Sequence, residues 1–165
     1  MFPVDMDPLF MLLEMTRGIE QKIEHHPEVD VFDHSIQTMN WAFKETDDTD
    51  LILAAMLHDV GKALNTLGHD QIGADWLEDF VSTKTIWLVR QHLRVWYLMT
   101  GKMKRKAKVR ELIEHPWLPE LVLLARWDKL GRNPNYVIKY NKEDIVERLN
   151  KLTEEHFKGE VVSYD

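Results

Sequence analysis

The feature that most constrains the fold is a run of seven apolar residues, 51–57, that ends in His58 and Asp59. Such a run predicts a buried helix, and Gly61, which follows directly, can end it. Backbone groups at a helix terminus are free of the regular hydrogen-bond ladder, so the chain there can turn two neighbouring side chains inward. The sequence therefore predicts an imidazole and a carboxylate side by side at a buried helix end.

Most of the remaining chain has the periodicity of helices, because its apolar residues recur at intervals of three and four. Outside Val161 and Val162, no alternating pattern of useful length predicts a strand. The helices that we predict cover about residues 8–25, 34–46, 49–59, 70–80, 85–98, 119–130 and a final segment after Asn141, with a weaker pattern over 102–113. Seven or eight helices without a long linker indicate an all-α fold, in which residues 1–165 form a single compact multi-helix domain.

Composition narrows the classes of function. The 165 residues fit one domain, and the net charge of −7 argues against extended coating of nucleic acid. The chain has no cysteine, so a metal site must use His, Asp and Glu. No apolar stretch approaches the roughly 20 residues of a membrane span, and the first residues lack the pattern of a signal peptide. We therefore expect a cytoplasmic protein without a membrane partner.

Two distant residues complete a candidate metal site. His34 lies in the first turn of the second predicted helix, and Asp128 lies near the end of the helix over 119–130. With His58 and Asp59 they supply two imidazoles and two carboxylates, a set that suits a catalytic metal with open water positions. A carboxylate near a helix C-terminus is unfavourable unless a cation compensates for the helix dipole. Singly, each residue also fits a structural role; together they predict a metal site.

This arrangement resembles the HD superfamily of metal-dependent phosphohydrolases, whose motif is a His, an adjacent His-Asp pair and a distant Asp. The closest pattern is that of the HD domain of bacterial tRNA nucleotidyltransferases, over about residues 26–132. The segments that carry the resemblance are His26-Pro27-Glu28-Val29-Asp30, Asp33-His34-Ser35, Ala55-Met56-Leu57-His58-Asp59-Val60-Gly61-Lys62, Gly68-His69, Gly73-Ala74, Val89-Arg90-Gln91-His92 and Ala125-Arg126-Trp127-Asp128. The chain shows no nucleotidyltransferase head, so the resemblance implies phosphohydrolase activity and not CCA addition. It also implies that the N- and C-terminal helices pack on this region.

The resemblance implies a divalent metal, one of Mg, Mn, Co, Ni, Fe or Zn, held by the four motif residues. HD proteins with further histidines before the last Asp can hold two metals, and His69 and His92 occupy that part of the chain. Asp59 is then the bridge and acts with these histidines in catalysis; alternatively, both histidines line the substrate cleft. Lys62 follows a glycine and can reach a phosphate at the metal, although an ordinary exposed lysine fits the same position.

The segment 102–110 stands out in an acidic chain because six of its nine residues are basic. Lys104, Arg105, Lys106 and Arg110 can guide a nucleotide or an RNA end toward the metal, although a solvated surface gives the same composition. Trp96 and Trp127 lie near the predicted site in the sequence and can stack a base. We therefore expect a hydrolase for phosphate esters of nucleotides or RNA termini. The alternative is a catalytically silent HD module that senses a nucleotide or binds a partner.

Overall fold

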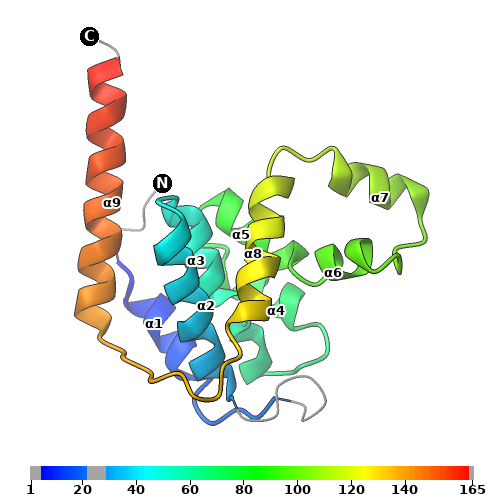
Figure 1. Ribbon diagram of the computed structural model, residues 1–165, viewed down its shortest axis with the longest axis horizontal. Coiled ribbons are helices and arrows are strands. Elements are labelled where there is room, and N and C mark those ends of the chain that lie inside the picture. The colour runs from blue at the N-terminus through cyan, green and yellow to red at the C-terminus, as the bar shows by residue number, and fades with distance from the viewer. Residues whose placement is uncertain (1–4, 22–28, 164–165) are drawn as a thin grey trace.

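The computed structural model describes residues 5–21 and 29–163 (Figure 1). These residues form nine α-helices and one short 3₁₀ helix and contain no β-strand, which confirms the all-α prediction. The elements are α1 (Asp7–Glu14), α2 (Val31–Glu45), α3 (Thr49–Leu57), the 3₁₀ helix η1 (Val60–Ala63), α4 (His69–Leu77), α5 (Thr83–Gln91), α6 (Arg94–Met99), α7 (Lys106–Ile113), α8 (Leu118–Leu130) and α9 (Lys142–Ser163).

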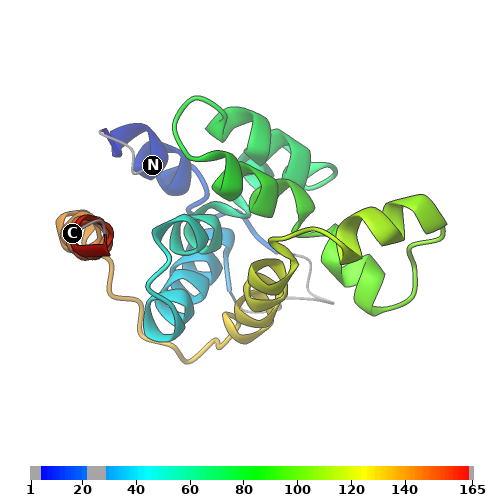
Figure 2. The same ribbon diagram turned by 90° about the horizontal axis from the view of Figure 1, so that it is seen from above.

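Helix α3 is the centre of the fold. Each of its seven residues after Asp50 is at most 1% exposed, as the apolar run predicts. It packs against α2, α5 and α8, and the first and last helices add Leu9, Leu13, Ile145 and Leu149 to the same hydrophobic core. In Figure 1, α1 and α9 lie on one side of this central group, while Figure 2 shows α6 and α7 projecting from the other. The end of α3 is therefore enclosed by helices from both halves of the chain.

The first helix is shorter than predicted, because α1 ends at Glu14. The Thr16 hydroxyl donates to the Leu13 carbonyl at 2.6 Å, and Gly18 adopts a φ of 76°, which turns the chain out of the helix. The Gly18 amide then donates to Asp30, the residue that caps α2, at 2.8 Å. The end of the predicted helix, and the first part of the motif segment that begins at His26, lie outside the described residues.

The predicted helix over 85–98 is two helices, α5 and α6, and this break accounts for the ninth helix. His92 is the C-cap of α5, and its Nδ1 lies 2.6 Å from the Val89 carbonyl. The weaker pattern over 102–113 forms a helix only from Lys106 onward, and Val161 and Val162 lie in α9 instead of a strand. The break matters for the site because it places the His92 side chain at a helix end.

The short helix η1 lies against α4 with no room for a side chain. A Cβ added at Gly61 would lie 2.1 Å from the backbone oxygen of His69 and 2.8 Å from the nitrogen of Gly73. This glycine therefore lets the segment after Asp59 approach the first turn of α4 and fixes where His69 begins that helix. No helix within the described residues is long and apolar enough to cross a membrane.

Candidate metal centre

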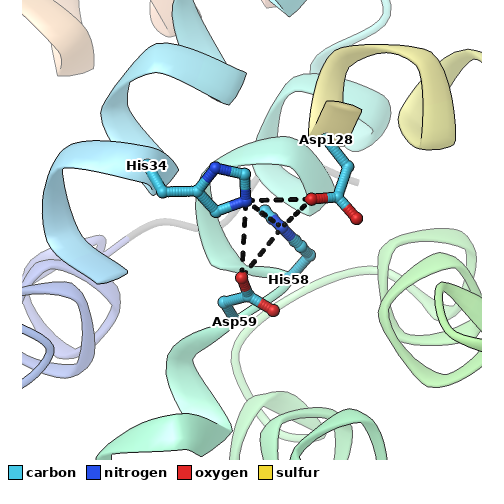
Figure 3. A group of neighbouring side chains, drawn as sticks. All are labelled: His34, His58, Asp59 and Asp128. Atoms are coloured by element: carbon cyan, nitrogen blue, oxygen red, sulfur yellow. Dashed lines mark hydrogen bonds and ion pairs between the residues drawn. The ribbon is translucent and has the colours of Figure 1, made fainter. Parts of the chain in front are cut away.

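Three helices bring the four motif residues together (Figure 3). His34 comes from the first turn of α2, His58 and Asp59 follow the last turn of α3, and Asp128 lies in the last turn of α8. His34 Nε2 lies 2.9 Å from Asp128 Oδ1 and 3.2 Å from His58 Nε2, which is itself 3.2 Å from Asp59 Oδ2. The four side chains are at most 8% exposed. They form a compact group with the geometry to hold one metal ion.

A second group shares Asp59 with the first. The other carboxylate oxygen of Asp59, Oδ1, lies 3.0 Å from His69 Nε2 and 3.4 Å from His92 Nε2. The two Nε2 atoms are 3.1 Å apart, and both side chains are at most 7% exposed. Asp59 thus directs one carboxylate oxygen to each group.

The backbone fixes the orientation of all four imidazoles. In each ring, Nδ1 lies close to a backbone carbonyl, which can only accept a hydrogen bond, so Nδ1 is the donor. These contacts are His34 to Gly131 at 2.8 Å, His58 to Ala55 at 2.8 Å, His69 to Thr66 at 2.8 Å and His92 to Val89 at 2.6 Å. A neutral ring held in this way directs the lone pair of Nε2 at the centre.

This donor set fits a divalent cation. The Nε2 atoms of His34 and His58 approach each other, and so do those of His69 and His92. If the rings are neutral, the two lone pairs in each pair face each other, and the carboxylates of Asp59 and Asp128 lie beside them. Such an arrangement is repulsive unless a cation or a proton lies between the donors. Imidazole nitrogens and carboxylate oxygens are common ligands of Zn, Fe, Co, Ni and Mn. The structure therefore supports the prediction that buried His and Asp residues can hold a metal.

The charges of the first group also favour a cation between its two carboxylates. Burial favours the neutral form of His58, but the charges of Asp59 and Asp128 outweigh it and raise its pKa to about 10. Burial works against the ionisation of both carboxyls; nevertheless His58, together with Lys62 beside Asp59, holds the pKa of each well below its usual range. Burial lowers the pKa of His92. The metal-free first group thus retains a positive charge, on His58, between its two carboxylates.

Several side chains support these ligands. Lys62 Nζ lies 3.3 Å from Asp59 Oδ2 and donates to Gln21 Oε1 at 2.9 Å. On the other side, Arg132 donates to Asp128 Oδ1 at 3.1 Å, and the Trp96 indole donates to Asp128 Oδ2 at 3.3 Å. Sequence reasoning missed Arg132, although its position one helical turn after Asp128 is a signal for such a contact.

The other aromatic and basic candidates lie apart from these ligands. Trp127 is fully buried and its indole donates to Glu45, so the hypothesis that it stacks a base is wrong. Lys104 and Arg105 line a cavity of about 950 Å³ between α4 and α7. The remaining two predicted guiding residues, Lys106 and Arg110, are exposed on α7 and do not line it.

The fold and these residues agree with the comparison to known families. A family model described as the HD domain matches residues 31–133, and the chain belongs to this family of metal-dependent phosphohydrolases. Curated relatives named multifunctional CCA protein are similar over a shorter stretch. The protein of Methylococcus capsulatus is 35% identical over 72 residues, and that of Haemophilus influenzae is 35% identical over 78. Each alignment covers 39% of this chain, but only 17% and 19% of the respective relative.

Proposed function

We propose that this protein is a metal-dependent phosphohydrolase that cleaves phosphate esters of nucleotides or RNA termini. The observation that carries the proposal is Asp59, which faces two histidines with each of its two carboxylate oxygens. In the proposal, His34, His58, Asp59 and Asp128 hold one ion, and Asp59, His69 and His92 hold a second. Divalent ions bound there supply a nucleophile by lowering the pKa of bound water and polarise the phosphoryl oxygens.

The protein side chains have separate tasks in this proposal. The carbonyl contacts of the four Nδ1 atoms keep the imidazoles in the tautomer that can bind metal. Lys62 stands beside Asp59 with its side chain 11% exposed, where its ammonium can meet a phosphate oxygen without leaving the site. Arg132 places a second positive charge next to Asp128 and is more accessible, with 31% of its side chain exposed. Together they can stabilise the negative charge that develops on a phosphate.

Two observations favour a nucleotide or an RNA end as the substrate. The relatives above are named for CCA, and the basic residues Lys104 and Arg105 stand at a cavity whose walls flank His69 and His92. A cytoplasmic location is part of the same proposal. So is the assignment of residues 1–165 to one HD-type domain, which the shared core of α1, α3 and α9 supports.

A substrate panel tests the proposal. Cyclic, mono- and triphosphate nucleotides and short RNAs are incubated with the protein and Mg, Mn, Co or Ni. We expect release of phosphate or opening of a phosphodiester with at least one metal, and a loss of more than about 100-fold in Asp59→Asn. Asp75→Asn is the matched control, because Asp75 is exposed and pairs with Arg90 away from both groups. Tight nucleotide binding without turnover under any metal would favour the alternative, a silent sensor.

Metal analysis tests the shared role of Asp59. We expect two equivalents per chain at saturation, and one equivalent after His69→Gln with His92→Gln. A single equivalent that this double substitution leaves unchanged would exclude a second ion and assign both histidines to the substrate cleft.

A further inference from the structure

A cavity of about 950 Å³ lies between α4, α5, α6 and α7. This volume is at the upper end of the range of about 300–1,000 Å³ that small-molecule sites occupy. It shares a wall with the second histidine group. Thr66, whose carbonyl orients His69, lines the cavity, and so do Gln91 and Leu93 on either side of His92. A molecule in the cavity therefore lies against the backbone that holds two candidate ligands.

The cavity is basic in an acidic protein. Arg94, Lys104, Arg105 and Lys108 line it, against only two acidic residues. Within the described part of the chain, neither Lys104 nor Arg105 has a salt-bridge partner. Arg105 is also the N-cap of α7, whose first amides receive no side-chain cap from any described residue. Unpaired cations beside an uncapped helix N-terminus favour an anion such as a phosphate.

The same cavity offers aromatic surface. Tyr97 lines it with 47% of its surface exposed, which is high for a large aromatic side chain. Trp87, which also lines the cavity, stacks on His115, with ring centroids 3.8 Å apart and planes 15° apart. Leu93 and Met103 complete an apolar lining. A flat ring can stack on such a surface, and proteins that bind single-stranded nucleic acid combine aromatic side chains that stack on bases with a positively charged groove.

We infer that this cavity is a nucleotide-binding subsite, in which Tyr97 stacks on the base and Lys104 and Arg105 bind a phosphate. A bare anion has no need of the aromatic lining, and an uncharged apolar ligand has no need of the unpaired Lys104 and Arg105. The nucleotide is either free or the terminal unit of an RNA strand, since both present the same base and phosphate. The inference rests on the proposed function for its role beside the metal centre, whereas the binding itself requires no turnover.

Binding to the full-length protein tests the subsite. The probe is the phosphonate analogue of AMP in which carbon replaces the 5′ oxygen, so that the protein cannot hydrolyse it, and the method is isothermal titration. We expect Tyr97→Ala to weaken binding about 5- to 150-fold, the range for loss of one stacked base, and Tyr97→Phe to keep it. Tyr97 is largely exposed, so the fold should survive both changes. Equal binding by all three proteins would overturn the stacking role.

A matched pair of basic substitutions separates a site from general attraction. Lys104→Ala with Arg105→Ala and Lys106→Ala with Arg110→Ala change the charge equally, but only the first pair lines the cavity. We expect the first pair to weaken phosphonate binding about 10-fold and the second less than about 2-fold. Equal losses would mean long-range steering and overturn the subsite. If inorganic phosphate binds as tightly as the phosphonate, the base contributes nothing to binding. The cavity would then be an anion site, and the nucleotide subsite would likewise be overturned.

Two further comparisons complete the test. A phosphorothioate-linked triadenylate that binds more tightly than the phosphonate would identify an RNA end as the source of the nucleotide, and weaker binding would identify a free nucleotide. Turnover with an unchanged KM in Tyr97→Ala would refute the subsite and leave the proposed function standing. Binding in the cavity without turnover under any metal would refute the proposed function and leave the subsite standing.

Discussion

Replacing Gly61 with alanine tests how the fold positions the second histidine group. The added Cβ would lie 2.1 Å from the His69 carbonyl oxygen and 2.8 Å from the Gly73 nitrogen. Carbon and oxygen normally approach to about 3.3 Å, so the first turn of α4 must move by about 1 Å. His69 begins that turn, and its Nε2 is only 3.0 Å from Asp59 Oδ1. The shift therefore separates His69 from the carboxylate that it shares with the first group.

The expected cost follows from the type of contact. Overpacking costs about 1–3 kcal/mol, and a clash of backbone with backbone belongs at the upper end because no side chain can rotate away. Alanine also lowers the conformational entropy of the unfolded chain, which offsets about 0.4–1 kcal/mol of this cost. A net loss of about 2–2.6 kcal/mol lowers the Tm by about 4–10 °C in a chain of this size. We also expect the bound manganese to fall from two equivalents to one.

Gly73→Ala is the control, because it adds the same methyl group to the other side of the same contact. Its Cβ would meet nothing closer than 3.3 Å, at the Gly61 nitrogen, and alanine favours the interior of α4 by about 0.5–1 kcal/mol. We expect a Tm within about 4 °C of the unmodified protein and full metal content. Circular dichroism at 222 nm and elemental analysis measure both quantities. If Gly61→Ala behaves like Gly73→Ala in both, this account of the contact is refuted.

Four further predictions concern the metal centre. Metal at a concentration of 100 times its Kd stabilises the folded protein by about 2.7 kcal/mol, so chelation of the metal should lower the Tm by about 5–11 °C. An unchanged Tm would contradict a metal site in the folded protein. Metal binding at pH 7 should release about one proton from His58, whose pKa is raised to about 10, and calorimetry in buffers of different ionisation enthalpy detects it; no release would contradict the charged His58. In the metal-free protein, the stability from charged His58 is complete below about pH 6.5 and is lost as the pH rises toward 10. Trp96→Phe removes the hydrogen bond to Asp128 and should weaken manganese binding about 10- to 100-fold, whereas Trp41→Phe, outside both groups, should not.

The sequence predicted the parts of the fold that depend on local pattern. The apolar run before His58 is a buried helix, and the first turn of α2 contains His34, because helical periodicity and a sharp terminus are properties of neighbouring residues. The predicted end of α1 was wrong because the helix stops at Glu14, and the Gly18 amide that follows bonds to Asp30, twelve residues away, a contact that the local pattern does not show. The break at His92 was also missed. The apolar pattern continues through it, while the imidazole turns toward a carboxylate more than 30 residues distant.

The candidate site was predictable as a set of residues but not as a geometry. The resemblance to HD proteins with further histidines points to His69 and His92, yet only the structure shows that they face the second oxygen of Asp59. The cavity could not be predicted from the sequence, because four helices and the segments that connect them contribute its walls. The composition of the basic segment does not separate Lys104 from Lys106. Only the structure shows that Lys104, before the start of α7, lines the cavity, whereas Lys106, in its first turn, does not.

The central claim is that Asp59 joins two metal-binding groups. The most direct measurement is anomalous diffraction from crystals loaded with manganese. We expect two peaks about 3.5–4 Å apart, one beside each carboxylate oxygen of Asp59, with the first near His34, His58 and Asp128. Peaks elsewhere in the molecule, with none beside Asp59, would contradict the account.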